Sequence, residues 1–345
     1  MPLVQQFTYP TSVELEQIEA VKLPRLTTDS PIFGLFPFQG RRTHLLEWTQ
    51  KDNYGGMQQI RGLNGMPASV ARVGQKSFMM KPGVYGEFTA VDEMELTTRA
   101  AMGRPNVPVS LDDLVTECQD MLLTRRLNRI EWLCWQVVVN GYFVTLDHKG
   151  AILHTDQFDV QTYTAINSIE DPETGTPLQD FINISDMGRG MSTSFGAGAT
   201  CYVNQTTATR LMSNRNADDL WGIKLGGGNS PLGIDDVNTI LSRKGLPRVV
   251  VYDEGYFNES GTFVNYIPDN VGIVIGRRQS GAPLGAFRYT INVNNPGGTP
   301  APYTRVIDHF DRRIPRLVEV HDGFNGGPCL FFPGSILKMK FGTVV

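Results

Sequence analysis

One stretch, residues 110–140, constrains what this chain can fold into more than any other. It reads SLDDLVTECQDMLLTRRLNRIEWLCWQVVVN, and its apolar residues recur at spacings of three and four, the period of one face of an α-helix. Ser110 can accept a hydrogen bond from an unpaired backbone N–H, with Asp113 three residues on, and Asn140-Gly141 is typical of the turn that closes a helix. The pattern therefore predicts one helix roughly 45 Å long.

The sequence around this helix favours strands. Among 345 residues there are 36 glycines and 21 prolines but only 19% charged residues, and the apolar residues come in short runs bounded by turn signals. The 41% of apolar residues are ample for a buried core, and the length allows two or three domain-sized units. We expect an α+β fold in which strands brace one long helix.

Composition also excludes several classes of protein. A net charge of −4 gives no basis for holding nucleic acid by neutralising phosphates. Cys118, Cys134, Cys201 and Cys329 are widely spread without CxxC pairing, so we expect them to be reduced and buried, as in a cytoplasmic protein. The first ten residues lack the features of a signal peptide, and no apolar run approaches the length of a membrane span.

The first 42 residues predict an extended arm. They contain five prolines and one expected short helix, SVELEQIEAV from Ser12, and they alternate too loosely to close a core. The run IFGLFPF, which carries Phe36 and Phe38, is too apolar to remain in water. We expect it to bury against the body or against a neighbour.

Residues 43–98 predict a long β-hairpin. Its strands lie in THLLEWTQ, which carries Trp48, and in KSFMMKPGVYGEFTAVDEMEL, around the turn-rich tip DNYGGMQQIRGLNGMPAS. A two-stranded ribbon is marginally stable in water. The hairpin is therefore expected to rest on another surface, that of a second subunit.

After the long helix, short strands and helices follow. Two strands, GYFVTLD and GAILHTDQFDV, flank His148-Lys149-Gly150, and the acidic segment 170–179 predicts a domain boundary. The further elements expected are a helix in LQDFINISDMGRGM, a strand and a helix capped by Asn204 or Thr206 in ATCYVNQTTATRLMSN, a glycine-rich loop in WGIKLGGGNSPLG, a helix from Ile234 to Gly245, a strand at 248–252 and a strand ending at Gly276. The closing block predicts a strand pair with its turn at Asn325-Gly326-Gly327-Pro328.

Candidate catalytic and ligand sites lack the spacing that their chemistry needs. Gly226-Gly227-Gly228 does not open a helix after a strand, so a flexible loop is favoured over a phosphate site. Asp253, Glu254 and Glu259 crowd a turn without the EF-hand spacing of a calcium loop. The five histidines are scattered, without i,i+4 pairs: His44, His148, His154, His309 and His321. We predict no catalytic residue, metal or cofactor, and no enzyme.

Arg125, Arg126 and Arg129 form a basic patch on the long helix, and two interpretations of it stay open. They form the solvated face of the helix, paired with Glu117 or Glu131, or they contact acidic residues of a neighbouring subunit.

The order of arm, long hairpin, long helix, boundary, mixed unit and closing strands resembles the major capsid proteins of tailed bacteriophages, specifically the lambda-type E family. The resemblance covers most of residues 40–345. The segments that carry it are SLDDLVTECQDMLLTRRLNRIEWLCWQVVVNGYF, TPLQDFINISDMGRGM with GATCYVNQTTATRLMSN, LSRKGLPRVVVYDEGYFNESGTFVNYIPDNVGIVIG and PRLVEVHDGFNGGPCLFFPGSILKMKF. This chain departs from the family in having no Trp between the boundary and Trp221, and residues 226–233 look like a local insertion.

The resemblance implies the Hong Kong 97-type phage capsid fold. Its parts would be an N-terminal arm at 1–42, an extended loop at 43–98, a peripheral domain at 99–175 with the spine helix at 110–140, an axial domain at 176–303 and closing strands at 304–345. The hairpin and arm would lie across adjacent subunits. The residues then expected at subunit interfaces are Arg125, Arg126, Arg129, Trp48, Lys76, Lys81, Phe36 and Phe38.

The implied function is that of a major capsid protein. Copies would self-assemble as hexamers and pentamers into an icosahedral head that encloses double-stranded DNA without sequence-specific binding and without a membrane. Scaffold, portal and decoration proteins are candidate partners, and the protein would be assembled in the host cytoplasm and reside in the virion. Some relatives carry cross-links from a lysine of the loop, where Lys51, Lys76 and Lys81 lie, although hairpin lysines are ordinarily solvated edge charges.

Two alternatives predict different particles. A bacterial nanocompartment shell would enclose a cargo enzyme in place of DNA. A β-rich hydrolase or sugar-binding module using the Tyr252–Gly261 turn would be a monomer or small oligomer with one concave pocket.

Overall fold

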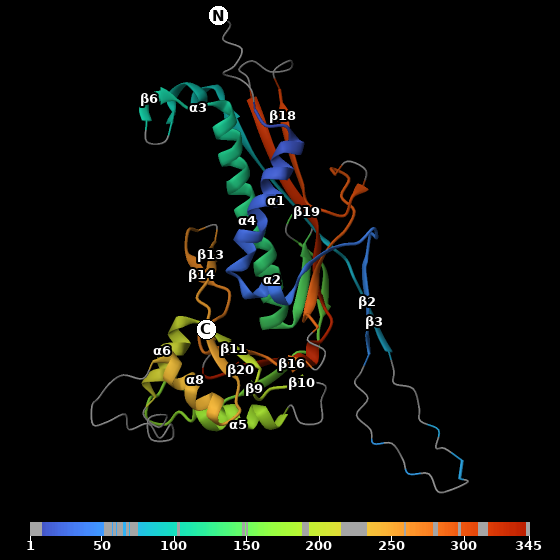
Figure 1. The fold of residues 1–345 in the computed structure, drawn as a ribbon, viewed down its shortest axis with the longest axis vertical. Coiled ribbons are helices and arrows are strands. Elements are labelled where there is room, and N and C mark those ends of the chain that lie inside the picture. The colour runs from blue at the N-terminus through green and yellow to red at the C-terminus, as the bar shows by residue number, and fades with distance from the viewer. Residues whose placement is uncertain are drawn as a thin grey trace, which may run out of the picture.

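The computed structural model shows an elongated molecule built along one long helix (Figure 1). The structure describes residues 9–51, 57, 60, 65–66, 69, 75–101, 104–146, 149, 151–187, 193–214, 233–258, 260–278, 282–295, 298–309 and 317–342. Four features predicted from sequence lie outside these residues: His148, Trp221, the Gly226-Gly227-Gly228 run and Glu259.

The helices are α1 (Ser12–Thr28), α2 (Pro31–Leu35), α3 (Glu93–Thr98), α4 (Leu111–Asn140), α5 (Pro177–Met187), α6 (Gln205–Ser213), α8 (Ile234–Arg243) and the 3-10 helix η3 (Pro333–Ser335). The strands are β1 (Phe38–Gly40), β2 (Leu46–Lys51), β3 (Gln75–Met80), β4 (Gly83–Asp92), β5 (Ala100–Ala101), β6 (Arg104–Pro108), β7 (Tyr142–Leu146), β8 (Ile152–Gln157), β9 (Gln161–Thr164), β10 (Thr193–Ser194), β11 (Thr200–Val203), β12 (Arg248–Val251), β13 (Gly255–Phe257), β14 (Phe263–Asn265), β15 (Val271–Ile275), β16 (Arg277–Arg278), β17 (Gly285–Tyr289), β18 (Tyr303–Asp308), β19 (Leu317–Leu330) and β20 (Ile336–Lys340).

The predicted long helix is confirmed as α4, with the expected signals at both ends. The Ser110 hydroxyl accepts a hydrogen bond from the Asp113 N–H at 3.1 Å. At the other end Gly141 takes a left-handed conformation, with φ of 71°, and donates its N–H to the Val137 carbonyl at 3.0 Å. These caps satisfy backbone groups that the helix leaves unpaired, so its bounds follow from local chemistry.

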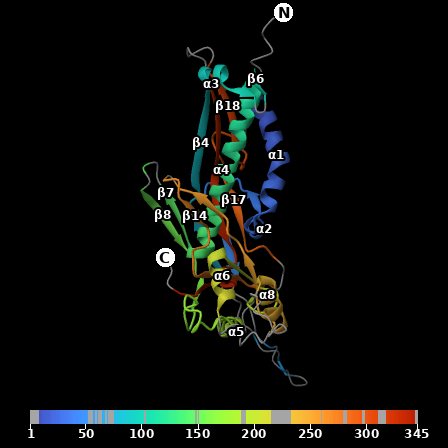
Figure 2. The same ribbon diagram turned by 90° about the vertical axis from the view of Figure 1, so that its left-hand side faces the viewer.

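A long sheet lies beside α4 and supports it along its length (Figures 1 and 2). Its central strand is β19, which pairs with β4 over residues 317–326 on one side. On the other side β19 pairs first with β18 and then with β17, and β1 adds to β17 in parallel. Because β19 contacts all three neighbouring strands, it connects parts of the chain that are far apart in sequence.

The turn predicted at residues 325–328 is wrong, since β19 runs straight through it. Glycine is required there because other chain segments come close: a Cβ on Gly326 would lie 2.5 Å from the Arg288 carbonyl oxygen. Pro328 lies beyond the end of the β4 pairing, where a strand can lack an N–H on one side. The chain reverses later, at η3, and β20 then joins a different sheet.

That second sheet has the strand order β12-β11-β15-β20-β9, with α5, α6 and α8 packed around it (Figure 1). The predicted helices and strands of this region are confirmed, and Asn204 caps α6 by accepting from the Thr207 N–H at 2.9 Å. Strand β9 precedes the expected boundary at 170–179, yet it pairs in parallel with β20. The chain therefore joins the second sheet before residue 165.

The arm differs from the extended segment that we expected. Helix α1 is longer than predicted, and it packs on α4 and β18 of its own subunit with Leu15 fully buried. Gln119 donates a hydrogen bond to the Leu15 carbonyl at 2.6 Å, and Lys22 pairs with Asp120 at 2.5 Å. The arm thus buries Leu15 against its own subunit and needs no neighbour to do so.

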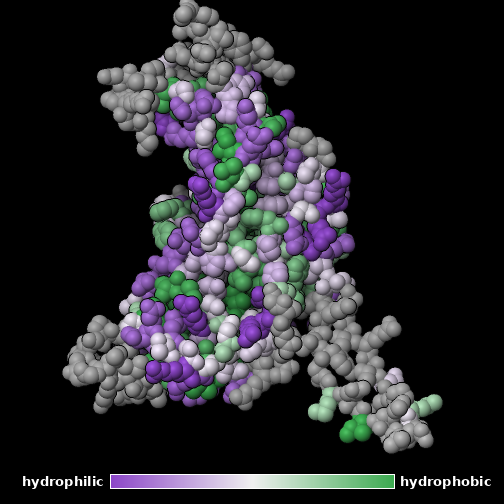
Figure 3. Space-filling view, viewed as in Figure 1, coloured by the Kyte–Doolittle hydropathy of each residue, from purple (hydrophilic) through white to green (hydrophobic). Residues whose placement is uncertain are grey.

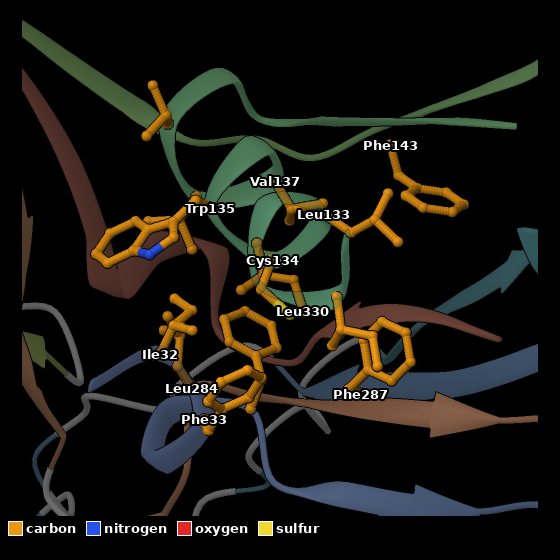
Figure 4. Close-up of a cluster of buried hydrophobic side chains, with 14 of the residues drawn as sticks. Ile32, Phe33, Leu133, Cys134, Trp135, Val137, Phe143, Leu284, Phe287 and Leu330 are labelled. Atoms are coloured by element: carbon orange, nitrogen blue, oxygen red, sulfur yellow. The ribbon is translucent and has the colours of Figure 1, made fainter. Parts of the chain in front are cut away.

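The apolar run after α1 also buries in its own subunit. Figure 4 shows Ile32 and Phe33 of α2 packed with Leu133 and Cys134 of α4 and with Phe287 of β17. The same cluster holds Phe36, which is fully buried, and Phe38 packs against its edge. The run is therefore buried by the body, one of the two outcomes we expected.

The predicted hairpin is shorter than expected. Strands β2 and β3 pair from Leu46–Met80 to Lys51–Gln75, and the ribbon projects from the body (Figure 1). Pro82 separates β3 from β4, which belongs to the long sheet and not to the hairpin.

Among the described helices, none is apolar over enough of its length to cross a membrane.

Candidate assembly interface

The base of the β2–β3 hairpin is anchored in its own subunit through Trp48. The indole Nε1 donates a hydrogen bond to the Leu330 carbonyl at 2.9 Å, and its ring stacks on Phe78 at 5.5 Å and on Phe158 at 6.1 Å. Trp48 is buried by these contacts at the root of the hairpin in its own chain, and its predicted place at a subunit interface stays a prediction.

The tip of the hairpin carries apolar side chains in water. Met57, Ile60 and Met66 are almost completely exposed, and Figure 3 shows apolar residues at the end of this projection. Nearer the body, the side chains of Lys76 and Lys81 are exposed. Apolar groups on a projecting ribbon are typical of a surface that a partner covers.

Arg125 lies on the solvated side of α4, as one of the two interpretations predicted, but with a different partner. Its guanidinium makes two hydrogen bonds to the Glu87 carboxylate of β4, at 2.5 Å and 2.9 Å. These bonds hold the pKa of Glu87 below its usual range. The pair joins the helix to the long sheet at an exposed position.

Arg126, the next residue, is buried in its own chain, so its predicted place on the solvated face is wrong, while its contact with a neighbouring subunit stays a prediction. It pairs with Asp322 of β19 at 2.6 Å and with Glu19 of α1, and Thr304 of β18 donates to both carboxylates at 3.3 Å. Burial raises the pKa of Asp322 to about 6, although the charge of Arg126 opposes the rise. The cluster ties arm, helix and sheet together within one subunit.

Arg129 sits over two aromatic rings. Its guanidinium carbon lies 5.3 Å from the centre of the Trp132 ring and 6.0 Å from that of Tyr85. Its side chain is exposed in the single chain, so it stays a predicted interface residue.

Glu131 is buried, although the sequence predicted it on the solvated face of the helix. Its Oε1 accepts hydrogen bonds from the Ser30 hydroxyl, at 2.5 Å, and from the Tyr252 hydroxyl. Burial raises the pKa of Glu131. One signal was present in the sequence, because the residue lies beside Ile130 and three positions before Cys134 on the apolar stripe.

Two further hairpins present apolar side chains that sequence reasoning did not single out. The β7–β8 ribbon exposes Leu146, Ile152 and Leu153, and the β13–β14 hairpin exposes Phe257 and Phe263. Both hairpins lie near the middle of the molecule along α4 (Figure 2). Together with the β2–β3 tip, they form the candidate assembly interface.

The described residues of the polar clusters make local hydrogen bonds and ion pairs. Asp253 accepts hydrogen bonds from the Gln205 N–H, at 3.1 Å, and from Asn265, at 3.2 Å. His309 and His321, which looked scattered, both approach one oxygen of Glu319, at 3.3 Å and 2.9 Å. In the part of the chain that the structure describes, no three His, Cys, Asp or Glu side chains are placed to hold a metal ion.

The cysteines are free, and Cys134, Cys201 and Cys329 are buried, as predicted. Cys118 is half-buried. Burial raises the pKa of the Cys118 thiol to about 11, which keeps it protonated and unreactive near neutral pH.

A spine helix braced by a long sheet, a second sheet with three helices and a projecting hairpin define the Hong Kong 97-type phage capsid fold. Three solved structures share it. They are a prophage capsid protein from E. coli CFT073 (TM-score 0.53, 14% identity, 78% of this chain and 80% of that chain), a phage-related protein from Bordetella bronchiseptica RB50 (0.52, 11%, 92% and 96%) and the capsid of a native GTA particle (0.52, 9%, 90% and 90%).

The chain belongs to the phage major capsid protein E family, whose sequence model matches residues 34–321. It is thus a shell-forming structural protein of the virion that assembles with copies of itself, and its family is not one of enzymes. No curated protein sequence matches this chain. Both the fold class and the family that the sequence suggested are confirmed.

Proposed function

We propose that the protein forms the icosahedral head of a tailed phage from hexamers and pentamers, and that the head encloses double-stranded DNA. The observation that carries this is the β2–β3 hairpin, whose exposed apolar tip has no covering surface among the described residues of its own chain. In a shell of adjacent copies, a neighbour supplies that surface.

Charge supports a DNA container that does not bind specific sequences. The net charge of −4 gives no excess of cations to neutralise phosphates, so packaged DNA would be held by enclosure and not by tight contacts. We further propose assembly in the host cytoplasm, with scaffold, portal and decoration proteins as partners.

Four exposed basic residues stay proposed interface residues: Lys76, Lys81, Arg125 and Arg129. The division into arm (1–42), extended loop (43–98), peripheral domain (99–175), axial domain (176–303) and closing strands (304–345) also stays a proposal. Strand β4 of the proposed loop pairs with β19, and β9, which precedes the proposed axial domain, pairs with β20.

Electron microscopy and sedimentation of the expressed protein test this function. We expect closed shells of uniform diameter from the full chain. A variant in which residues 52–74 are replaced by Asn-Gly should keep the far-ultraviolet circular dichroism of the parent but form no shells, because the tip no longer reaches a neighbour. A compact full-length monomer that never forms particles would overturn the proposal.

The contents of the particles separate a phage head from a nanocompartment shell. Nuclease-protected DNA in particles from phage-infected cells supports the head, whereas a co-purifying cargo enzyme supports the nanocompartment. Covalent cross-links from Lys51, Lys76 or Lys81 would appear as multimers that survive boiling in detergent.

A further inference from the structure

The β13–β14 hairpin has two faces with different environments. On one face Tyr256 stacks on Tyr266 with ring centres 6.0 Å apart and meets Trp132 of α4 at 6.4 Å. On the other face Phe257 and Phe263 form a register pair at the end of the ladder, with ring centres 5.4 Å apart. The contact of Tyr256 with Trp132 fixes the hairpin to the spine helix. Phe257 is 72% exposed, so the aromatic pair on the other face lies in water.

The described residues of the turn between these strands are joined by several hydrogen bonds. The Asn258 side-chain oxygen accepts the N–H groups of Ser260, at 3.1 Å, and Thr262, at 2.9 Å, while the Asn258 N–H donates to the Thr262 carbonyl at 3.0 Å. Gly261 takes the left-handed conformation that the turn requires, with φ of 76°. A pre-organised pair of aromatic side chains loses little entropy on binding, which is typical of residues that dominate an interface.

The β7–β8 ribbon presents a second apolar surface. Its inner face is held to the body by buried Phe143 and by a hydrogen bond of 3.3 Å from the Thr145 hydroxyl to the Lys81 carbonyl. Its outer end exposes Leu146, Ile152 and Leu153, and Leu146 and Ile152 are register partners. These aliphatic side chains have the chemistry to receive aromatic rings.

The two surfaces are separated across the spine helix in one view and lie on the same side of it in the view turned by 90°. In Figure 1 the β13–β14 hairpin is to the left of α4 and the green β7–β8 ribbon is to its right. Figure 2 shows both at the same level along the long axis. A ring of identical copies needs two different complementary patches on each copy, because each contact in a ring is heterologous.

We propose that Phe257 and Phe263 of one copy dock on the Leu146–Ile152 end of the β7–β8 ribbon of the next copy. This inference rests on the proposed arrangement in rings. The occupant is a second copy of this chain, since a shell-forming protein brings copies side by side and the matching surface is on the chain itself.

A pair of introduced cysteines tests the contact directly. The variant carrying Phe257→Cys and Ile152→Cys is assembled, mildly oxidised and run on a non-reducing gel. We expect disulfide-linked multimers up to five and six copies, and none above background in either single variant. The matched control pairs Phe257→Cys with Val293→Cys, a residue 97% exposed elsewhere, and should give no ladder.

Absence of multimers in intact particles, or equal multimers in the control pair, would overturn the contact while leaving shell formation established. If the cysteine pair prevents assembly, Phe257→Ser and Val293→Ser are compared instead. The protein concentration needed for particles should rise on the order of tenfold for Phe257→Ser only. Equal concentrations for the two variants would count against docking by a second copy and favour another protein as the occupant.

Discussion

Helix α4 carries two buried polar clusters five residues apart, and they are neutralised in different ways. Arg126 is surrounded by the carboxylates of Glu19 and Asp322, so charge is balanced by charge. Glu131 is met by the hydroxyls of Ser30 and Tyr252, and burial raises its pKa. The first cluster depends on its cation, whereas the second needs only an oxygen that accepts hydrogen bonds.

Both clusters join the arm to the body. Glu19 and Ser30 come from the first 42 residues, whereas Asp322 and Tyr252 come from the long sheet and from the chain after β12. Sequence-distant parts are thus joined by side chains at two levels of one helix.

The largest effect is expected for Arg126→Met. The substitution leaves Glu19 and Asp322 facing each other without a cation, and loss of one partner from a buried ion pair costs about 3 to 5 kcal/mol. Urea unfolding at pH 8 measures the change in the free energy of unfolding. The protein concentration is kept below that at which particles assemble. A loss below about 1 kcal/mol would contradict the idea that the cluster depends on charge.

The next effect is the pH dependence carried by Asp322. Its pKa is about 6 in the fold and near 3.8 when unfolded, so the folded state binds the proton more tightly. Its stabilising contribution is therefore complete below about pH 4 and is lost as pH rises to about 6. The difference in unfolding free energy between the parent and Asp322→Asn should fall by up to about 3 kcal/mol over that window. A difference that rises with pH would refute the assignment.

A smaller effect is expected at the second cluster. Glu131→Gln keeps an oxygen for Ser30 and Tyr252, so the cost should be about 1 kcal/mol or less. Glu131→Ala removes the acceptor from two buried hydroxyls and should cost about 2 to 3 kcal/mol. Equal losses for the two variants would mean that the carboxylate charge, and not its oxygen, stabilises this cluster.

The smallest effect is expected for Arg125→Met. Its pair with Glu87 is exposed to solvent and screened by salt, so the loss should stay below about 1 kcal/mol and shrink in 1 M salt. Comparing this variant with Arg126→Met isolates the effect of burial, because the two arginines are adjacent on one helix. A salt-independent loss as large as that of Arg126→Met would show that solvent exposure does not decide how much an ion pair contributes to the free energy of unfolding.

The parts of the fold that could be predicted from sequence are those with local causes. Ser110, Asp113 and Gly141 act within a few residues of the helix ends that they define, and Asn204 does so for α6. The burial of Arg126 depends on Glu19 and Asp322, which are more than a hundred residues away from it or from each other, so no local pattern could show it.

The glycines of β19 show how the same residue type has two meanings. Asn325-Gly326-Gly327-Pro328 has the composition of a turn, but in the fold Gly327 makes room for Met80 and Phe143 from other elements. Sequence alone does not reveal such close approaches. The exposed apolar pairs on β7–β8 and β13–β14 were missed for a related reason, since exposure depends on the surrounding fold.

The unbroken course of β19 has a mechanical consequence. Fourteen extended residues span roughly 46 Å, about the length of α4 beside it, and a strand already extended can hardly stretch. Force applied at the β18 end of the subunit would pass to the β17 end through one covalent backbone. When a shell deforms, bending of the subunit should therefore concentrate at the short 3-10 helix η3, which lies between the end of β19 and the start of β20 in the second sheet.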